Sequence, residues 1–223
     1  REDGGLQLWE TPRGQFWMPR ESAAMIPLVL AEQEQKIYGR GHRDVRRGDM
    51  VGALTAFRSA RDTTAELLAR TPGDPQRIYE HAQSVYWVGY SDWQHGDFPA
   101  AETAMREYQQ LSDRLVAIDP ANMDWQAEQS YSHANLGVML MDEGRARDAI
   151  EQFEASRRAN LRRVAAKADD ATARLDLGQD YSWLSSAHAQ DLQFGKAAEE
   201  RTQEVALYEG MLRNDPGNAV ALE

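Results

Sequence analysis

Residues 136–153, LGVMLMDEGRARDAIEQF, contain landmarks that recur along the chain at a single interval. The pair Leu136-Gly137 has counterparts 48 residues away on either side, at Val88-Gly89 and at Leu184-Ser185. Three other classes of residue, namely turn glycines, small residues and prolines, keep the same interval. They are Gly48, Gly96 and Gly144; Ala53, Ala101 and Ala149, with Ala198 one residue late; and Pro72, Pro120 and Pro216, with Ala168 at the vacant step. Four classes of marker that share one period indicate a structural repeat.

Each repeat predicts two helices. Apolar residues recur at helical spacing from Trp125 to Met141, and Gly144 should end this helix because glycine adopts the left-handed conformation of a helix cap. A second amphipathic helix is expected from Arg147 to about Lys167. The small residue at the Ala149 step allows close helix approach, with bulky Phe57, Met105 and Phe153 filling the adjacent grooves. We therefore predict no strand within residues 50–215 and turns near Gly48, Pro72, Gly96, Pro120, Gly144, Ala168 and Gln193.

The order of these landmarks resembles that of the tetratricopeptide repeat family. The family pattern is Leu-Gly, then Gly seven residues later, Ala five further on, and an aromatic residue four after that. The third unit matches it fully, the second has one softened position, and the fourth has Ser185 and Gln193 where glycine is usual. The matching residues are Leu136, Gly137, Gly144, Ala149 and Phe153; Val88, Gly89, Gly96, Ala101 and Met105; and, in a first unit with an interrupted first helix, Gly41, Gly48, Ala53 and Phe57.

The repeat is longer than the roughly 34 residues of the family. Seven extra residues precede Leu136 and seven follow Phe153, and seven residues are close to two helical turns, so each helix lengthens without rotating its buried face. Residues 119–125, DPANMDW, also resemble long-period bacterial variants from multidomain signalling proteins. The expected fold is all-α: a superhelical stack, or α-solenoid, of about four long antiparallel helical hairpins. This repeat domain covers residues 28–223, in units of approximately 28–72, 73–120, 121–168 and 169–216.

Residues 1–27 do not fit the repeat and are expected to form a separate N-terminal arm. The string LQLWETPRGQFWMP at 6–19 surrounds a Pro/Gly turn with β-favouring aromatic residues, which predicts a short hairpin or an extended arm. Trp9, Phe16 and Trp17 should cap the first helical hairpin or pack onto a neighbour. The string faintly resembles the leader of some methyltransferases, so an accessory domain of a methyltransferase is a remote alternative. Because the sequence opens at Arg1, we take it as part of a longer protein.

Composition excludes several classes of function. A formal net charge of -11 argues against nucleic-acid binding, and the basic stretch at 157–163 is interpreted as a solvated helix face. The apolar runs are too short to span a membrane. The absence of cysteine excludes disulfides and thiolate metal sites, and none of the five histidines pair at the i, i+4 spacing of a helical metal site. We therefore expect no enzyme, catalytic residue, metal or cofactor, and favour a cytoplasmic over an extracytoplasmic location.

The resemblance implies a binding groove along the first helix of each unit. Its ligand-facing positions lie five and two residues before the motif leucine and two and five after it, and they include Ala134 in the third unit and Gln179, Ser182, Ser186 and Ala189 in the fourth. Asn135 alone resembles a residue of the clamp that holds chaperone tails in this family. The candidate groove residues are Gln83, Tyr86, Tyr90, Trp93, Tyr131, Asn135, Val138 and Met141.

The expected function is a non-catalytic scaffold within a larger signalling or regulatory protein. In the expected groove, Tyr86, Tyr90 and Trp93 form one helical stripe with Tyr131 beside it, suited to a protein or peptide ligand with apolar anchors and basic flanks. The competing interpretation is that the long helices bury Tyr86 and Trp93 in the core. The alternative function is self-association as a homo-oligomer, or regulation of a further domain.

Overall fold

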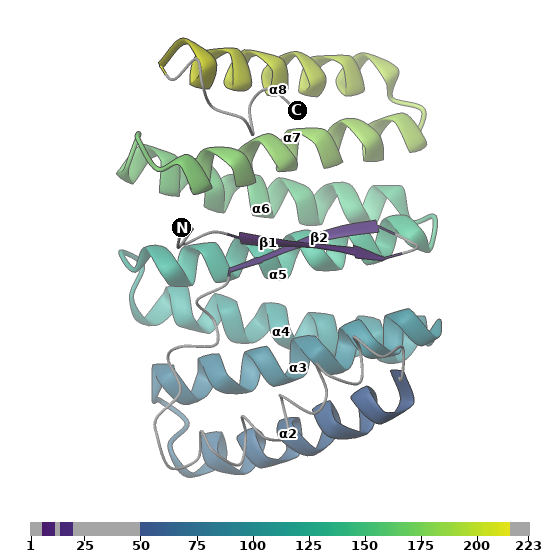
Figure 1. Ribbon diagram of the computed structural model, residues 1–223, viewed down its shortest axis with the longest axis vertical. Helices are drawn as coiled ribbons and strands as arrows, with labels where there is room; N and C mark the ends of the chain where they lie inside the picture. Colours follow the sequence, from purple (N-terminus) through teal and green to yellow (C-terminus); the bar gives the residue numbers. More distant parts are fainter. Residues whose placement is uncertain (1–5, 12–13, 20–49, 215–223) are drawn as a thin grey trace. The chain divides into compact units, whose positions relative to one another are not determined.

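The computed structural model describes residues 6–11, 14–19 and 50–214 (Figure 1), and seven α-helices lie within these ranges. They are α2 (Met50–Arg70), α3 (Pro75–His95), α4 (Phe98–Ile118), α5 (Met123–Asp142), α6 (Ala146–Ala166), α7 (Ala171–Gln190) and α8 (Phe194–Asn214). No strand occurs between residues 50 and 214, so the predicted all-α class is confirmed. The chain forms two compact units, residues 1–108 and 109–223, whose boundary falls within α4. Each unit is described by itself.

The helix starts are set by capping residues that recur along the sequence. The first residues of α3, α5 and α7 are 48 residues apart, and so are those of α4, α6 and α8. Asp74, Asn122 and Asp170 precede the first helices of the three pairs, and each side chain accepts a hydrogen bond from a backbone N–H of the first turn. Such a side chain satisfies one of the N–H groups that a helix start leaves without a partner. These caps explain why helices begin where the repeat places them.

The predicted turns are confirmed wherever the structure describes them; the turn near Gly48 lies outside the described residues. Gly96 and Gly144 adopt positive φ angles of 82° and 77°, as expected for helix caps. In the fourth unit the equivalent residue is Leu192, with φ 61°, so the prediction that Gln193 takes the glycine position is wrong by one residue. The small residue there is likewise the buried Ala197, whereas Ala198 is exposed.

Within the first unit, α2 packs on α3 and α3 packs on α4. Ala53, Phe57 and Ala101 are fully buried. The ring of Phe57 stacks on Trp87 with centroids 5.2 Å apart. A Cβ added to Gly89 would lie 3.0 Å from the Cβ of Ala104, which shows how closely α3 approaches α4.

Within the second unit, α5, α6, α7 and α8 pack in succession, and Figure 1 shows them side by side. A Cβ added to Gly137 would lie 2.5 Å from the ring of Phe153, so the motif glycine is required by close approach of α5 and α6. Phe153 in turn stacks on Trp183 of α7, with centroids 5.4 Å apart. This pair occupies the same repeat positions as Phe57 and Trp87 in the first unit.

Replacing Ala149 by Leu should destabilise the second unit. Ala149 is fully buried on α6, which packs on α5 and α7, and a larger side chain would overpack these contacts at a cost of about 1–3 kcal/mol. Urea unfolding followed by circular dichroism measures the effect. Ala165→Leu, at an exposed position of the same helix, is the matched control and should change stability by less than about 0.5 kcal/mol. Equal midpoints for the two variants would mean that the repeat alignment is wrong.

The N-terminal arm contains an antiparallel hairpin of β1 (Leu6–Thr11) and β2 (Gly14–Pro19). Its register pairs Leu6 with Pro19 and Trp9 with Phe16. A hairpin is thus found where the sequence left a hairpin and an extended arm open. The packing of Trp9, Phe16 and Trp17, and the interval between the arm and α2, fall outside what the structure describes, so the division at residue 27 stays a prediction.

Candidate interaction site

The predicted aromatic stripe is present on α3, but it is part of the core. The ring centroids of Tyr86 and Tyr90 are 6.2 Å apart, and those of Tyr90 and Trp93 are 6.3 Å apart. Trp87 lies against both tyrosines, and Tyr108 of α4 packs 5.4 Å from Tyr86. The stripe is therefore one side of an aromatic cluster that joins α3 to α4.

Burial corrects the expectation that these rings form an open groove floor. Trp93 is 0% exposed, Tyr86 6% and Tyr90 7%. Burial also raises the pKa of the Tyr90 hydroxyl to about 12. The physical reason is area: large rings gain most from removal from water, and a helix of this length offers them partners on its neighbours. The burial agrees with the competing interpretation, in which Tyr86 and Trp93 are core residues.

Tyr131 belongs to the second unit and is also buried. Its hydroxyl donates a hydrogen bond to Asp176 Oδ2 on α7, 3.2 Å away. The same carboxylate accepts from Arg163 Nη1 of α6 at 2.5 Å, and this guanidinium group also donates to Asn160. The sequence predicted that Tyr131 lies beside the aromatic stripe on α3. Because that contact would lie between the two units, it stays a prediction.

A second carboxyl group lies one turn further along α7. Asp180 is 0% exposed and accepts from Ser156 Oγ at 2.6 Å and from Asn160 Nδ2 at 2.7 Å. Burial raises its pKa to about 8, because these neutral donors only partly offset the loss of water. Burial also raises the pKa of Asp176, against the opposing effect of Arg163. This buried polar network was missed by the sequence interpretation, although a carboxylate pair at i, i+4 on a helix with apolar neighbours was a visible signal.

The basic stretch of α6 is less solvated than the sequence suggested. Arg163 is buried in the network just described. Arg157 pairs with Glu200 at 2.9 Å and with Glu154 at 2.6 Å, and it lies over the ring of Tyr181. Ion pairs within the protein thus involve three of the four arginines, Arg157, Arg158 and Arg163.

Open positions of the second unit lie on α5 and α7. Asn135, Val138 and Met141 are half-buried on α5, and Ser186 is exposed on α7 at the repeat position of Val138. Of the other predicted residues, Gln83 is half-buried in the first unit. These positions carry no formal charge. By contrast, α6 and α8 expose several charged residues, including Arg147, Glu151, Arg162, Lys196 and Glu199.

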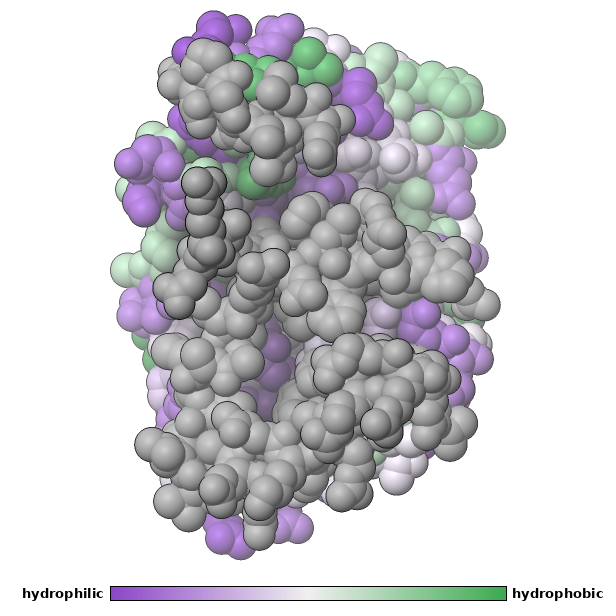
Figure 2. Space-filling view, viewed as in Figure 1, coloured by the Kyte–Doolittle hydropathy of each residue, from purple (hydrophilic) through white to green (hydrophobic). Residues whose placement is uncertain are grey.

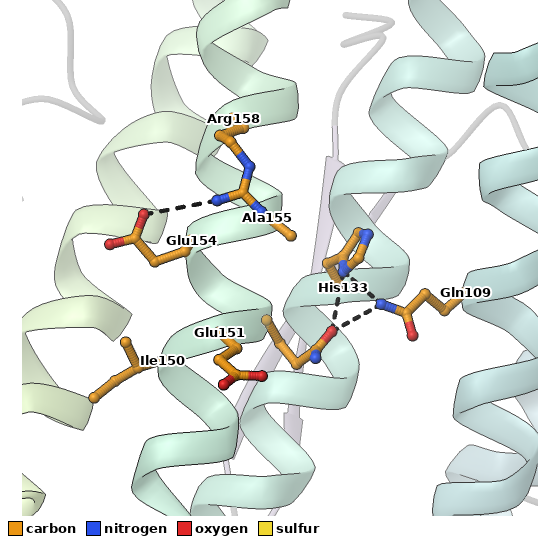
Figure 3. Close-up of a pocket in the computed structure, with 8 residues that line it drawn as sticks. Gln109, His133, Ile150, Glu151, Glu154, Ala155 and Arg158 are labelled. Carbon is orange, nitrogen blue, oxygen red and sulfur yellow. Dashed lines mark hydrogen bonds and ion pairs between the residues drawn. The ribbon is translucent and has the colours of Figure 1, made fainter.

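A cavity of about 520 Å³ lies between α4, α5 and α6 within the second unit. At its polar floor, the side-chain amide of Gln109 on α4 donates to both His133 of α5 and Gln152 of α6 (Figure 3). Gln109 Nε2 is 2.6 Å from His133 Nδ1 and donates to Gln152 Oε1 at 2.8 Å. Ile150, Glu151, Glu154, Ala155 and Arg158 complete the lining.

Behind the floor, a carboxylate faces His133. His133 Nε2 lies 3.6 Å from Asp113 Oδ1, and Gln129 donates a hydrogen bond to the same oxygen at 2.7 Å. Burial tends to raise the pKa of Asp113, but the hydrogen bonds from His133 and Gln129 outweigh it and hold the pKa below its ordinary value. Asp113 is therefore ionised at neutral pH and adds negative charge near the cavity.

Two further properties bear on the chemistry of the described part of the chain. No group of three or more metal-ligating side chains occurs among the described residues. None of the described helices is both long enough and apolar enough to cross a bilayer. Apolar residues are visible over α7 and α8 beside charged ones (Figure 2), and the described exposed apolar residues in this region include Leu192, Phe194 and Val205.

Comparison with known proteins finds similar structures only. No protein-family model matches the chain, and no curated protein matches it in sequence. A crystal structure of MamA protein is 14% identical, with 82% of this chain and 96% of that chain covered and a TM-score of 0.41. A Podosopora anserina kinesin light chain with nearly identical TPR-like repeats is 14% identical, with 88% and 100% covered and a TM-score of 0.36.

A third similar structure is a mutant of the Thermobaculum terrenum O-GlcNAc transferase, which is 19% identical with a TM-score of 0.36. The match covers 77% of this chain and 27% of that enzyme. Because all three TM-scores lie below 0.5, we derive neither a family nor a function from these structures.

Proposed function

We propose that this chain is a non-catalytic helical-repeat scaffold, a long-period relative of tetratricopeptide repeats, that binds a protein or peptide. Its setting would be a larger signalling or regulatory protein in the cytoplasm. The observation that carries the proposal is a set of uncharged positions on α5 and α7, Asn135, Val138, Met141 and Ser186, that remain partly open. Depletion of charge at an open surface is typical of the centre of protein interfaces.

Contact between α5 and α7 supports a shared surface. Val138 and Ser186 occupy equivalent positions on α5 and α7, and these two helices contact each other. A single ligand can therefore touch both. In the first unit the equivalent residue is the buried Tyr90, so the aromatic cluster supports the helices, whereas the open residues of the second unit would contact the ligand.

Site-specific photo-crosslinking tests the proposal. A benzophenone amino acid placed at position 138 or 186 should capture the same partner from the cells that express the protein. The same probe at position 202, which is an exposed threonine on α8, is the control and should not capture it. Different captured proteins at 138 and 186, or equal capture at all three positions, would contradict a partner surface on α5 and α7.

Self-association is favoured by one observation of its own. Leu192 is 75% exposed and Phe194 is 65% exposed, and both lie at the turn that joins α7 to α8. Large apolar side chains with this exposure mark contact surfaces when they lie together. Light scattering of the purified protein measures its mass in solution. A dimer mass that falls to the monomer mass in Phe194→Ser would support this alternative. A monomer mass at all concentrations would exclude it.

A further inference from the structure

The cavity between α4, α5 and α6 contains one carboxylate that no other described residue neutralises. Glu151 lines the cavity, is exposed, and makes no hydrogen bond or ion pair within the described part of the chain. The remaining polar groups of the floor bond to one another, because Gln109 donates to both His133 and Gln152. The unpaired charge in this cavity is therefore the negative charge of Glu151.

The other charges that face the cavity do not reverse this sign. Glu154 accepts a hydrogen bond from Arg157 Nη2 at 2.6 Å, and it lies 4.0 Å from Arg158. Arg158 is the one guanidinium group in the lining, and Glu154 is its nearest carboxylate. From α4, Asp113 adds an ionised carboxylate behind His133. The lining thus holds two carboxylates, Glu151 and Glu154, against one arginine. Outside the lining, Asp113 adds a carboxylate and Arg157 adds a guanidinium group, so the balance stays negative. In a chain with a net charge of -11, this local potential favours a cation.

The size and walls of the cavity suit a long side chain. Its volume of about 520 Å³ greatly exceeds the roughly 30 Å³ that one water molecule occupies. Ile150 and Ala155 supply an apolar wall beside the polar floor. Lysine and arginine combine a hydrocarbon stem with a charged head, and they bury the stem along apolar surface while the head meets a polar group.

The geometry points to this cavity as a docking site for a lysine or arginine side chain of a partner protein. The cationic head would lie at Glu151, and the stem would pack against Ile150 and Ala155. The inference rests on the proposed function only in taking the cation to come from a bound protein. It adds a second contact surface, formed by α4, α5 and α6, and specifies the chemistry of the group that enters it.

Nuclear magnetic resonance titration with small probes tests the site without a partner. The full chain is titrated with Nα-acetyl-lysine methylamide, and the side-chain signals of Gln109, His133 and Gln152 are followed. The lysine probe should shift them saturably, whereas Nα-acetyl-norleucine methylamide, which keeps the stem and lacks the ammonium group, should not. Glu151→Gln should weaken the apparent Kd about threefold or more, in the range expected for an exposed ion pair. Glu199→Gln, an exposed site on α8 with the same charge change, should leave it unaltered.

Several outcomes would overturn the inference. They are a linear response without saturation, equal shifts from the norleucine probe, or equal weakening by Glu151→Gln and Glu199→Gln. Saturable binding of Nα-acetyl-glutamate methylamide in place of the lysine probe would assign the cavity to an anion at Arg158. Binding of the lysine probe with no capture from positions 138 and 186 would leave this site standing and defeat the proposed function. Capture from positions 138 and 186 without binding of the lysine probe would support the scaffold and reject the cavity as a docking site.

Discussion

Asp180→Asn should stabilise the protein progressively as the pH rises from about 4 to 8. In the folded chain, burial raises the pKa of Asp180 to about 8, whereas the ordinary value for aspartate is 3.8. Between these values the folded carboxyl keeps a proton that the unfolded chain has lost. Its contribution is therefore fully present below the unfolded pKa and decreases as the pH rises, by roughly 1.4 kcal/mol per pH unit.

The asparagine variant removes this linkage and keeps the local geometry. An amide has the shape of a carboxyl group, so its oxygen can accept from Asn160 and its nitrogen can donate to Ser156 Oγ. The measured quantity is the difference in free energy of unfolding between variant and parent, from urea titrations at several pH values. This difference should be small near pH 4 and should increase toward pH 8.

Asp169→Asn is the matched control for this titration. Asp169 is exposed in the turn between α6 and α7, and the substitution makes the same change in charge. Its effect on stability should remain small and vary little with pH. A difference for Asp180→Asn that is constant across the pH range would mean that Asp180 is ionised in the folded protein, and hence that water or a cation reaches it.

Trp93→Ala should destabilise the first unit by about 3–5 kcal/mol, the cost of removing a large buried ring. Trp93 is fully buried, and its ring contacts Tyr90 in an edge-to-face arrangement. The loss of helical circular-dichroism signal on urea titration measures the effect. A groove residue would behave differently, because truncation of an open side chain leaves the folded state intact and removes only ligand contacts.

Trp125→Ala provides the control for loss of a tryptophan. Trp125 is half-buried in the first turn of α5, so its removal should shift the unfolding midpoint less than Trp93→Ala does. An unchanged midpoint for Trp93→Ala would show that the ring is accessible in solution. The aromatic stripe would then return as a candidate binding floor.

Some errors of register in the fourth unit have a simple cause. The sequence interpretation placed the fourth turn at Gln193 and the small residue at Ala198, each one residue beyond the 48-residue interval from Gly144 and Ala149. The chain keeps its interval and holds Leu192 at a positive φ of 61°, with Ala197 buried below. A non-glycine residue in this conformation carries a local cost, which packing of α7 on α8 offsets. Local preference was therefore a poor guide at this one turn.

The stacked pairs illustrate a different limit. Phe57 on Trp87 and Phe153 on Trp183 join the second helix of one pair to the first helix of the next. Phe57 and Phe153 were identified as groove fillers from their place in the motif. Their tryptophan partners were not identified, because those residues have no place in the motif and are brought near only by packing between successive pairs.

The sequence by itself determined the all-α class, the helix pairs and nearly every turn, because helix starts and ends depend on residues within a few positions of each other. Asp74, Asn122 and Asp170 cap their own helices, and Gly96 and Gly144 end theirs. The tertiary structure alone decided whether equivalent positions on different first helices are buried or open. Tyr90 and Val138 occupy equivalent positions, yet the first is core and the second is partly open, since burial depends on the side chains that neighbouring helices present. The neutral state of Asp180 has the same origin, because it depends on how completely α6 and α7 exclude water from its carboxyl group.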